Sequence, residues 1–249
     1  MRTTTYRFTG AAHPLRVAVI ADFHDGDAAP VIDAVKEIAP DAIFVVGDVV
    51  HNAKRIERGM VLLRALIGIA PVFCSLGNHE FKCDGDIRAR IRRTGVRLLD
   101  DGYTTLGGFV IGGLSSGYEG HVQGKLKRTP DPDWTWLDEF ARVEGTHVLL
   151  SHHPEYYPRK LSGLPVELIL SGHAHGGQWR FFNRGVFAPG QGILARFVGG
   201  VYRGRRLVKG TAALSAEQSL LLVSRGLANE VHIPRIGNPT ELIVIEFAV

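Results

Sequence analysis

The sequence predicts an α/β fold, and three observations lead to this prediction. Up to residue 95, short apolar runs alternate with amphipathic stretches, which is the pattern of strands joined by crossover helices. Each of these runs stops at a Gly or an Asp, so polar residues gather where the strands end. From Val96 onward the rhythm changes to short strands separated by glycine turns, which predicts a second sheet within one domain spanning residues 1–249.

The first half of the chain is expected to form a parallel sheet with helices on its face. Proline fits the first turn of a helix, so Pro30 is expected to open one. The carboxyl ends of parallel strands meet at one edge of a sheet, where open α/β sheets bind their ligands. The predicted strands are 16–21, 42–46 and 72–76, and the further helices are 56–67 and 87–94.

The second half of the chain is expected to add one helix and four strands. The first two of these strands are each followed by a loop that contains histidine. The helix is predicted over 133–142, and the strands over 147–150, 166–170, 220–223 and 242–247.

Composition places the chain among globular proteins of a reducing compartment. With 249 residues, of which 45% are hydrophobic and 22% charged, the chain can bury a large core. Its two cysteines do not make a disulfide framework. Residues 1–13 lack the apolar region of a signal peptide, and the best candidate for a membrane span, 61–76, is broken by Arg64 and Pro71. We therefore expect a cytoplasmic protein without a transmembrane anchor.

Seven side chains that can bind metal ions follow the predicted strands. A carboxylate that follows a Gly at a strand end, as Asp48 does, can bridge two cations and offset their repulsion. Mixed imidazole, carboxylate and amide ligands suit Mn, Fe, Zn or Co better than Ca, so two such divalent ions are the expected cofactors. The predicted ligands are Asp22, His24, Asp48, Asn78, His152, His173 and His175.

A pair of divalent ions indicates hydrolysis of a phosphoester. Two ions about 3.5–4 Å apart clamp an in-line displacement at phosphorus and lower the pKa of a bound water toward about 7, which gives a hydroxide nucleophile. The leaving oxygen then needs a proton, and His79, beside Asn78, is placed to supply it. The sequence thus predicts a dinuclear-metal phosphohydrolase that cleaves a phosphodiester or pyrophosphate bond.

Taken in order, these motifs resemble the calcineurin-like metallophosphoesterases, whose pattern reads D-x-H, GD, GNH-[DE], a lone His and GH-x-H. The resemblance implies a four-layer α/β/β/α sandwich of two mixed sheets flanked by helices, with a dinuclear site at which His79 is catalytic and is not a ligand. It assigns one ion to Asp22, His24, Asp48 and His175, and the other to Asp48, Asn78, His152 and His173. The matching motifs are Asp22-Phe23-His24, Gly47-Asp48, Gly77-Asn78-His79-Glu80, His152 and Gly172-His173-Ala174-His175, within a match from about Arg16 to Gln178.

Two positions depart from this pattern or leave it open. Many relatives carry an acidic residue three positions after the bridging Asp, where it can orient the catalytic His, but this chain has His51. Either another group orients His79, or that histidine works with less support. Beside His152, His153 offers a second imidazole, so an exchange of these two as the metal ligand stays open.

The segment 179–210 is expected to be a region that faces the substrate or a membrane. From 179 to 216 the chain carries seven Arg or Lys residues, six aromatic residues and no Asp or Glu. Two interpretations are open: an extended loop whose aromatic side chains pack on the sandwich, or an amphiphilic rim that contacts lipid or an anionic bilayer.

The motif GHAHGGQ and the later motifs at 224–227 and 238–241 are similar to those of one bacterial branch of the family. Members of that branch, which include UDP-diacylglucosamine hydrolases, are often linked to membranes and cell-envelope lipids. The expected partners are therefore a phosphoester substrate, small or lipid-linked, and an anionic membrane contacted peripherally at its inner face.

Two other functions are kept as alternatives. A nuclease is suggested by the net charge of +4 and the pI near 9.2. Nucleic-acid binding usually shows a broader Lys/Arg stripe, so nucleic acid is not the expected partner. A non-catalytic metal-binding scaffold on the same fold would normally have lost ligands, and no ligand position of the pattern is lost here.

Overall fold

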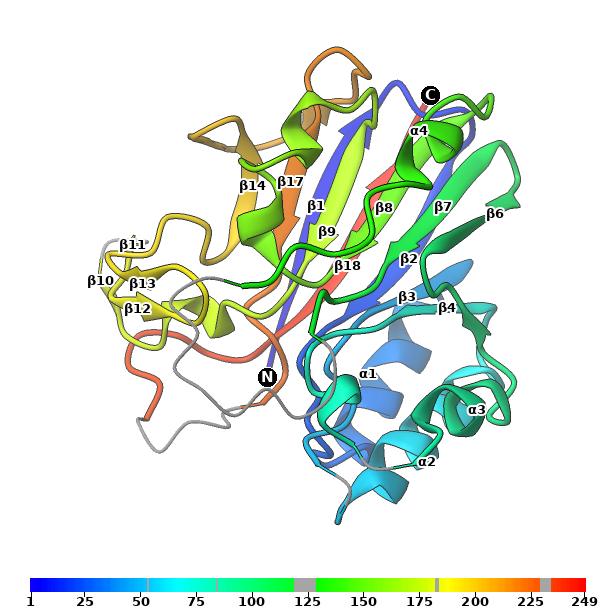
Figure 1. Ribbon diagram of the computed structural model, residues 1–249, viewed down its shortest axis with the longest axis vertical. Helices are drawn as coiled ribbons and strands as arrows, with labels where there is room; N and C mark the ends of the chain where they lie inside the picture. The colour runs from blue at the N-terminus through cyan, green and yellow to red at the C-terminus, as the bar shows by residue number, and fades with distance from the viewer. Residues whose placement is uncertain (53, 84, 119–128, 182–183, 229–233) are drawn as a thin grey trace.

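Two mixed β-sheets packed face to face form the centre of the molecule in the computed structural model (Figure 1). The structure describes residues 1–249 except 53, 84, 119–128, 182–183 and 229–233. Over the described residues each sheet has seven strands, and helical segments lie on the outer faces. The expected α/β class and the arrangement of two mixed sheets with helices are confirmed.

The first sheet contains the parallel strands predicted for the first half of the chain. Strands β2 to β5 pair in parallel, and β18 runs antiparallel to β2 on the other side. The strand order is β16 (Ala212–Ala213), β1 (Arg2–Thr9), β18 (Glu241–Phe247), β2 (Leu15–Ile20), β3 (Ala42–Val46), β4 (Val72–Ser75) and β5 (Arg97–Leu98).

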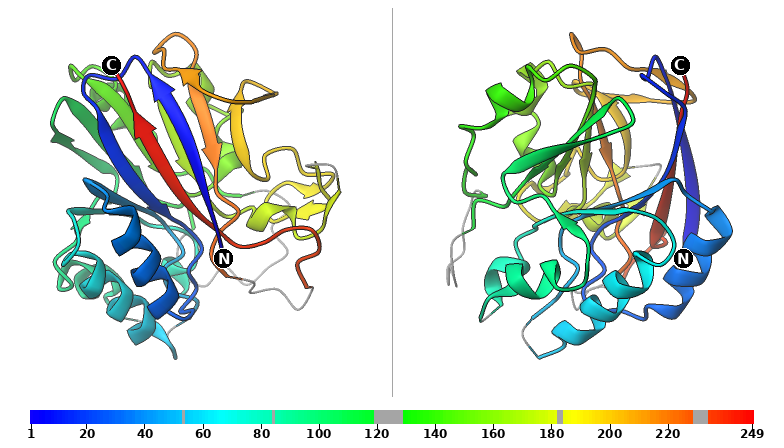
Figure 2. Two further views of the ribbon diagram at one scale, coloured as in Figure 1. Left: turned by 180° about the vertical axis from the view of Figure 1, so that it is seen from behind. Right: turned by 90° about the vertical axis from the view of Figure 1, so that its right-hand side faces the viewer.

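Strand β3 shows why this sheet is buried on both faces. Side chains alternate between the faces of a strand, so Phe44 and Val46 pack between the sheets while Ile43 and Val45 pack under the helices. The helices on this sheet are α1 (Ala29–Ile38), α2 (Ile56–Leu66) and α3 (Ile87–Arg92), and the one-turn helix η1 (Glu80–Lys82) precedes α3. Figure 2 shows α1, α2 and α3 together beside the first sheet.

Strand β1 lies within the first sheet, although no strand is predicted from the sequence of residues 1–13. It pairs in parallel with β18 along seven residues and with β16 on its other side. Most of its side chains are exposed or half-buried, and Phe8 alone is fully buried. A strand with so little apolar character shows no periodic signal in the sequence, and its partners in the sheet lie more than 200 residues away.

The second sheet is parallel at its centre, where β7, β8, β9 and β17 lie side by side. On one side β14 and β15 extend it through antiparallel pairs, and on the other side β6 does so. The strands are β6 (Gly102–Leu106), β7 (Phe109–Leu114), β8 (Thr146–Ser151), β9 (Leu168–Ser171), β14 (Gly200–Arg203), β15 (Arg206–Val208) and β17 (Leu220–Val223).

The helix on this second sheet is shorter than the predicted 133–142. The α-helix α4 covers Leu137–Phe140, because the Asp133 side chain accepts hydrogen bonds from the N–H (2.9 Å) and the hydroxyl (2.6 Å) of Thr135 and so forms a turn before it. The rest of the outer layer contains the one-turn helices η2 (Pro154–Tyr156) and η3 (Leu161–Gly163).

The described part of 179–210 forms short hairpins rather than one extended loop. Strand β10 (Arg180–Phe181) pairs with β11 (Arg184–Gly185), and β12 (Phe187–Ala188) pairs with β13 (Gly192–Ile193). The two hairpins lie together at the end of the second sheet (Figure 1). Within the described ranges, no helix combines the length and the apolar character needed to cross a bilayer.

Candidate active site

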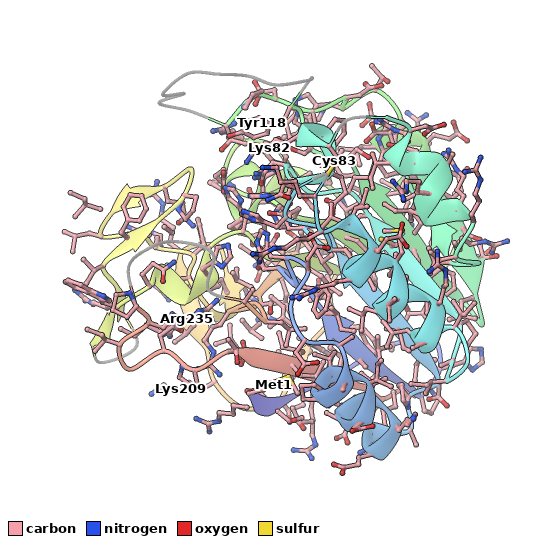
Figure 3. All side chains as sticks on the ribbon, turned by 90° about the horizontal axis from the view of Figure 1, so that it is seen from below. Met1, Lys82, Cys83, Tyr118, Lys209 and Arg235 are labelled. Carbon is pink, nitrogen blue, oxygen red and sulfur yellow. The ribbon has the colours of Figure 1, made fainter. Side chains whose placement is uncertain are left out.

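The loops that follow β2, β3, β8 and β9 meet at one edge of the sandwich. Within each sheet they are joined by backbone hydrogen bonds, from Asp22 N–H to the Gly47 carbonyl (3.3 Å) and from Gly172 N–H to the His152 carbonyl (3.0 Å). Across the sheets, the N–H of His173 donates to the Asp22 carboxylate at 3.0 Å. Figure 3 views the molecule from below, with Lys82, Cys83 and Tyr118 labelled toward the top of the view and Arg235 nearer the hairpins. Polar side chains from both sheets are therefore held at a single edge.

The backbone turns sharply at the residues that carry the predicted ligands. Asp22, His24, Asp48, His173 and His175 all have left-handed conformations, with φ between 46° and 63°. Residues other than glycine rarely adopt this region, and such strain is concentrated at functional sites. The turns direct these side chains out of the strand ends.

Glycines in the motifs are required by close approach to the same carboxylates. A Cβ atom on Gly77 would lie 2.2 Å from Oδ1 of Asp48, and one on Gly172 would lie 2.8 Å from Oδ2 of Asp22. Any side chain at either position would displace a carboxylate, which explains why Gly precedes the predicted ligand in both motifs.

Six of the seven predicted ligands form two compact groups. Asp22, His24 and His175 make one, and Asp48, His152 and His173 make the other, with the ligand atoms of each group within 4.8 Å of one another.

Asp48 lies between the two groups. Its Oδ2 is 3.1 Å from Nε2 of His152 in its own group and 3.7 Å from Nε2 of His24 in the other. Two ligands that each lie about 2.1 Å from one ion cannot be more than about 4.2 Å apart, so these separations fit coordination.

The seventh predicted ligand, Asn78, is buried, and the backbone N–H of the next residue, His79, donates to Oδ1 of Asp48. Oδ1 of Asn78 has no hydrogen-bond partner among the described residues, and the same holds for Nε2 of His24. Each such buried orphan costs about 1–3 kcal/mol. Divalent cations would satisfy both atoms, so the residues present fit a pair of metal ions.

The electrostatics of the site also suit cations. Burial lowers the pKa of His24 and of His173 well below its ordinary value, which keeps these imidazoles neutral, as metal ligands must be. Burial lowers the pKa of His152 as well, but the charge of Asp48 outweighs it and raises that pKa to about 10. The His152–Asp48 pair thus holds a proton that a bound cation would displace.

His79 faces the groups without belonging to either one. Its Nε2 lies 4.0 Å from Oδ2 of Asp48, and its side chain is partly exposed. Its Nδ1–H donates to the backbone carbonyl of His51 at 2.7 Å, while its backbone N–H donates to Oδ1 of Asp48 at 2.8 Å. The group that orients His79 is therefore a carbonyl of residue 51, in place of the acidic side chain that the resemblance leads one to expect there.

The structure separates the two adjacent histidines after β8. Nδ1 of His152 donates to the carbonyl of Val46 at 2.8 Å, which turns Nε2 toward Asp48. His153 is hydrogen-bonded through Nε2 to the hydroxyl of Ser116 (2.7 Å), and its Nδ1 lies 3.5 Å from Glu155. His152 is the histidine placed beside Asp48, and His153 belongs to a neighbouring buried group with Glu155 and His173.

Glu80 supports the site in a role that was not predicted from the sequence. Its buried carboxylate accepts hydrogen bonds of 2.8–3.2 Å from four backbone N–H groups, those of Asp48, Val49, Val50 and Gly77. Burial, reinforced by the charge of Asp48, raises the pKa of Glu80 to about 7. The position of Glu80 in the motif GNHE is the sequence feature that could have indicated this role.

Residues from the C-terminal part of the chain complete the edge. Asn238 donates to the carbonyl of His175 at 2.8 Å, and a Cβ on Gly226 would lie 2.7 Å from the side chain of Asp22. The guanidinium of Arg235 approaches the His175 ring at 3.4 Å. The later motifs at 224–227 and 238–241 thus contact the loops that carry the predicted ligands.

Comparison with known proteins places the site in a family context. The sequence profile of the calcineurin-like phosphoesterases matches residues 15–177. The chain is 23% identical to the UDP-2,3-diacylglucosamine pyrophosphatase LpxG of Chlamydia trachomatis, over 94% of this chain and 83% of that protein.

Two further relatives have no assigned activity. An uncharacterized metallophosphoesterase of Campylobacter jejuni is 27% identical over 66% of this chain and 45% of its own length. The uncharacterized metallophosphoesterase YkuE of Bacillus subtilis is 29% identical over 61% of this chain and 53% of its own length. The chain thus spans about half the length of these two relatives.

Two solved structures align with this chain at low identity. The protein TT1561 of Thermus thermophilus aligns with a TM-score of 0.43 at 14% identity, over 64% of this chain and 81% of that chain. The nuclease MPE of Pseudomonas putida aligns with a TM-score of 0.37 at 15% identity, over 86% of this chain and 76% of that chain.

Proposed function

The chain belongs to the calcineurin-like phosphoesterase family, and from that premise we propose that it is a dinuclear-metal phosphohydrolase that cleaves a phosphodiester or pyrophosphate bond. The observation that carries this proposal is the arrangement of the ligand atoms: two groups of buried Asp and His side chains lie side by side with Asp48 between them. All seven ligand positions are kept, which argues against a non-catalytic scaffold.

In this proposal each ion has four protein ligands. Asp22, His24, Asp48 and His175 would hold one, and Asp48, Asn78, His152 and His173 would hold the other. When bound, such a pair supplies a Lewis acid to the phosphoryl oxygens and activates water at neutral pH. The donor set suits Mn, Fe, Zn or Co.

His79 would protonate the leaving oxygen. Its Nδ1 is occupied by the carbonyl of His51, so Nε2 is the nitrogen available to exchange a proton with the substrate. Nε2 lies on the side of Asp48, where the phosphorus would be clamped. Help of this kind contributes on the order of 10²–10⁴ in rate.

We extend the proposal to a lipid-linked substrate and a peripheral contact with anionic membrane, with the protein otherwise in the cytoplasm. Support comes from Ile193 and Leu194 on the β12–β13 hairpin, whose exposed fractions are 78% and 80%. Leu194 lines a cleft with the arginines 184, 196 and 205. An adjoining cleft reaches from Leu194 to Glu155, beside the ligand His173. A phosphate at the ligands could therefore carry an apolar chain along this surface.

Metal analysis combined with substrate profiling tests the proposal. We expect two divalent ions per chain and chelator-sensitive cleavage of aryl phosphodiesters or of a nucleoside-diphosphate-linked lipid, in preference to single-stranded DNA. A purified protein that binds no divalent metal would overturn the dinuclear site. Preferential cleavage of DNA would instead favour the nuclease alternative.

A further inference from the structure

The catalytic candidate His79 is held by main chain rather than by a carboxylate. Besides the 2.7 Å hydrogen bond from its Nδ1 to the carbonyl of His51, the two imidazole rings stack, with centroids 5.0 Å apart and planes 30° apart. The orientation of His79 therefore depends on where the main chain places residue 51.

A buried carboxylate fixes residue 51. Asp25 is 1% exposed, and its Oδ2 accepts the N–H of His51 at 2.8 Å while its Oδ1 accepts the N–H of Gly59 at 3.1 Å. The N–H of Asp25 donates to the carbonyl of Val49 at 3.0 Å. Asp25 itself follows His24 in the left-handed turn, with φ of 56°. The carboxylate thus connects the loop after β2, the loop after β3 and helix α2.

The carboxylate of Asp25 also faces the peptide group that receives His79. Its surroundings include the backbone N–H groups of His51, Gly59 and Asn52. The Asn52 N–H belongs to the same peptide group as the His51 carbonyl, so Asp25 faces both peptide groups of residue 51.

We propose that Asp25 is the positioning residue for His79, acting through the main chain of residue 51. An acidic side chain at position 51 would orient the histidine directly, whereas here the carboxylate stands one residue away and the backbone carbonyl makes the contact. This inference rests on the proposed role of His79 as the general acid.

Asp25→Asn tests the inference, because an amide keeps the shape of the side chain but cannot accept both N–H bonds. A general acid matters most when the leaving group is poor. We therefore expect kcat to fall about tenfold or more for a phenyl ester and much less for a nitrophenyl ester, with KM and metal content retained. Asp27→Asn is the matched control, since exposed Asp27 accepts, within the described part of the chain, only the Ala29 N–H (3.1 Å) on the same loop.

A double-mutant cycle separates positioning from general support of the loop. If Asp25 acts through His79, adding Asp25→Asn to His79→Ala should lower kcat less than about twofold further, whereas independent effects multiply. Two results would overturn the inference while leaving the role of His79 intact. One is a double variant in which the losses of kcat multiply, and the other is an Asp25→Asn variant whose loss of kcat is the same for every leaving group.

Two further outcomes complete the test. If His79→Ala shows no dependence on the leaving group, the general-acid role fails and the inference fails with it. If Asp25→Asn does not fold, Asp25→Ser, which keeps one acceptor without the charge, carries the same expectations. ¹⁵N NMR gives a readout independent of turnover. In the wild type, the neutral His79 ring should carry its proton on Nδ1, and in the Asp25→Asn variant the population of this tautomer should fall.

Discussion

Asp48 is the residue on which both proposed ions depend. Its Oδ2 lies within 4.0 Å of imidazole nitrogens of His152, His24 and His79. Although burial opposes ionisation, the charges of His152 and His79 hold the pKa of Asp48 well below its usual range. A carboxylate that stays ionised while fully buried is suited to lie between two cations.

Asp48→Asn should therefore remove most metal and most activity, because the amide has the same shape but no charge to offset the repulsion between two ions. We expect fewer than two ions per chain and a loss of activity greater than about 100-fold, since even supporting residues cost 10–100-fold. Elemental analysis and phosphodiesterase rates measure both, with the exposed Asp41→Asn as control. A fully loaded, active variant would remove Asp48 as the bridge.

His79→Ala should separate turnover from metal binding. His79 contacts Asp48 only through a backbone N–H and a distant Nε2, so both ions should be retained. We expect kcat to fall by about 10²–10⁴ with metal content unchanged. The control is His13→Ala, at an exposed histidine on the loop before β2. A variant with near-normal kcat would show that another group protonates the leaving oxygen.

At the scale of elements, the site depends on loops that follow neighbouring strands. Glu80 connects the loop after β3 to the loop after β4 through its four N–H bonds. The hydrogen bond from His173 to Asp22 connects the two sheets. Each strand end is hydrogen-bonded to its neighbours within its sheet, so these few contacts set the relative positions of the predicted ligands.

Glu80→Gln should loosen the loop after β3. Each oxygen of Glu80 accepts two of the four N–H bonds, and the amide nitrogen cannot accept any, so two buried N–H groups lose their partner. Each lost partner costs about 1–3 kcal/mol of unfolding free energy. Thermal unfolding in the presence of chelator measures this effect apart from metal binding. Exposed Glu37→Gln on α1 is the control, and equal stability of the two variants would show that the four N–H bonds contribute little.

At the scale of the whole molecule, the β10–β11 and β12–β13 hairpins lie at the end of the second sheet (Figure 1). The N–H of Val186, between the two hairpins, donates to the carbonyl of Gly177, two residues after His175. The hairpins combine exposed apolar residues with arginine, and the sequence from 179 to 216 contains no acidic residue. Binding of such a surface to a membrane is favoured both by insertion of its apolar side chains and by attraction to anionic lipids.

Replacing both Ile193 and Leu194 with Asp should weaken binding to vesicles of phosphatidylglycerol and phosphatidylethanolamine several-fold, because it removes the apolar contact and adds repulsion. Cosedimentation measures binding, which should also weaken with salt. Cleavage of a water-soluble diester should be unchanged. Val61→Asp, at a 51% exposed position on α2, is the control. Equal binding by wild type and both variants would contradict this surface as the contact.

Much of the fold was predictable because its signals are local. The runs that became β3 and β17 have the predicted bounds, since buried strands read as continuous apolar segments between turn residues. The ligand motifs were equally visible, because each consists of adjacent residues after a strand. Strand β1 was not predicted because its apolar periodicity is weak. Helix α4 is shorter than predicted because the Asp133 side chain forms a turn before it.

The sequence by itself determined the residue types of the site, their order and the α/β class, because these depend on chemistry and short-range pattern. Only the tertiary structure decided which side chains meet. It put His152 beside Asp48 and turned His153 toward Ser116 and Glu155. It also put the carbonyl of His51, whose N–H is bound by Asp25, against Nδ1 of His79. These contacts join residues tens of positions apart, and the packing of strand ends sets their distances, which no local pattern records.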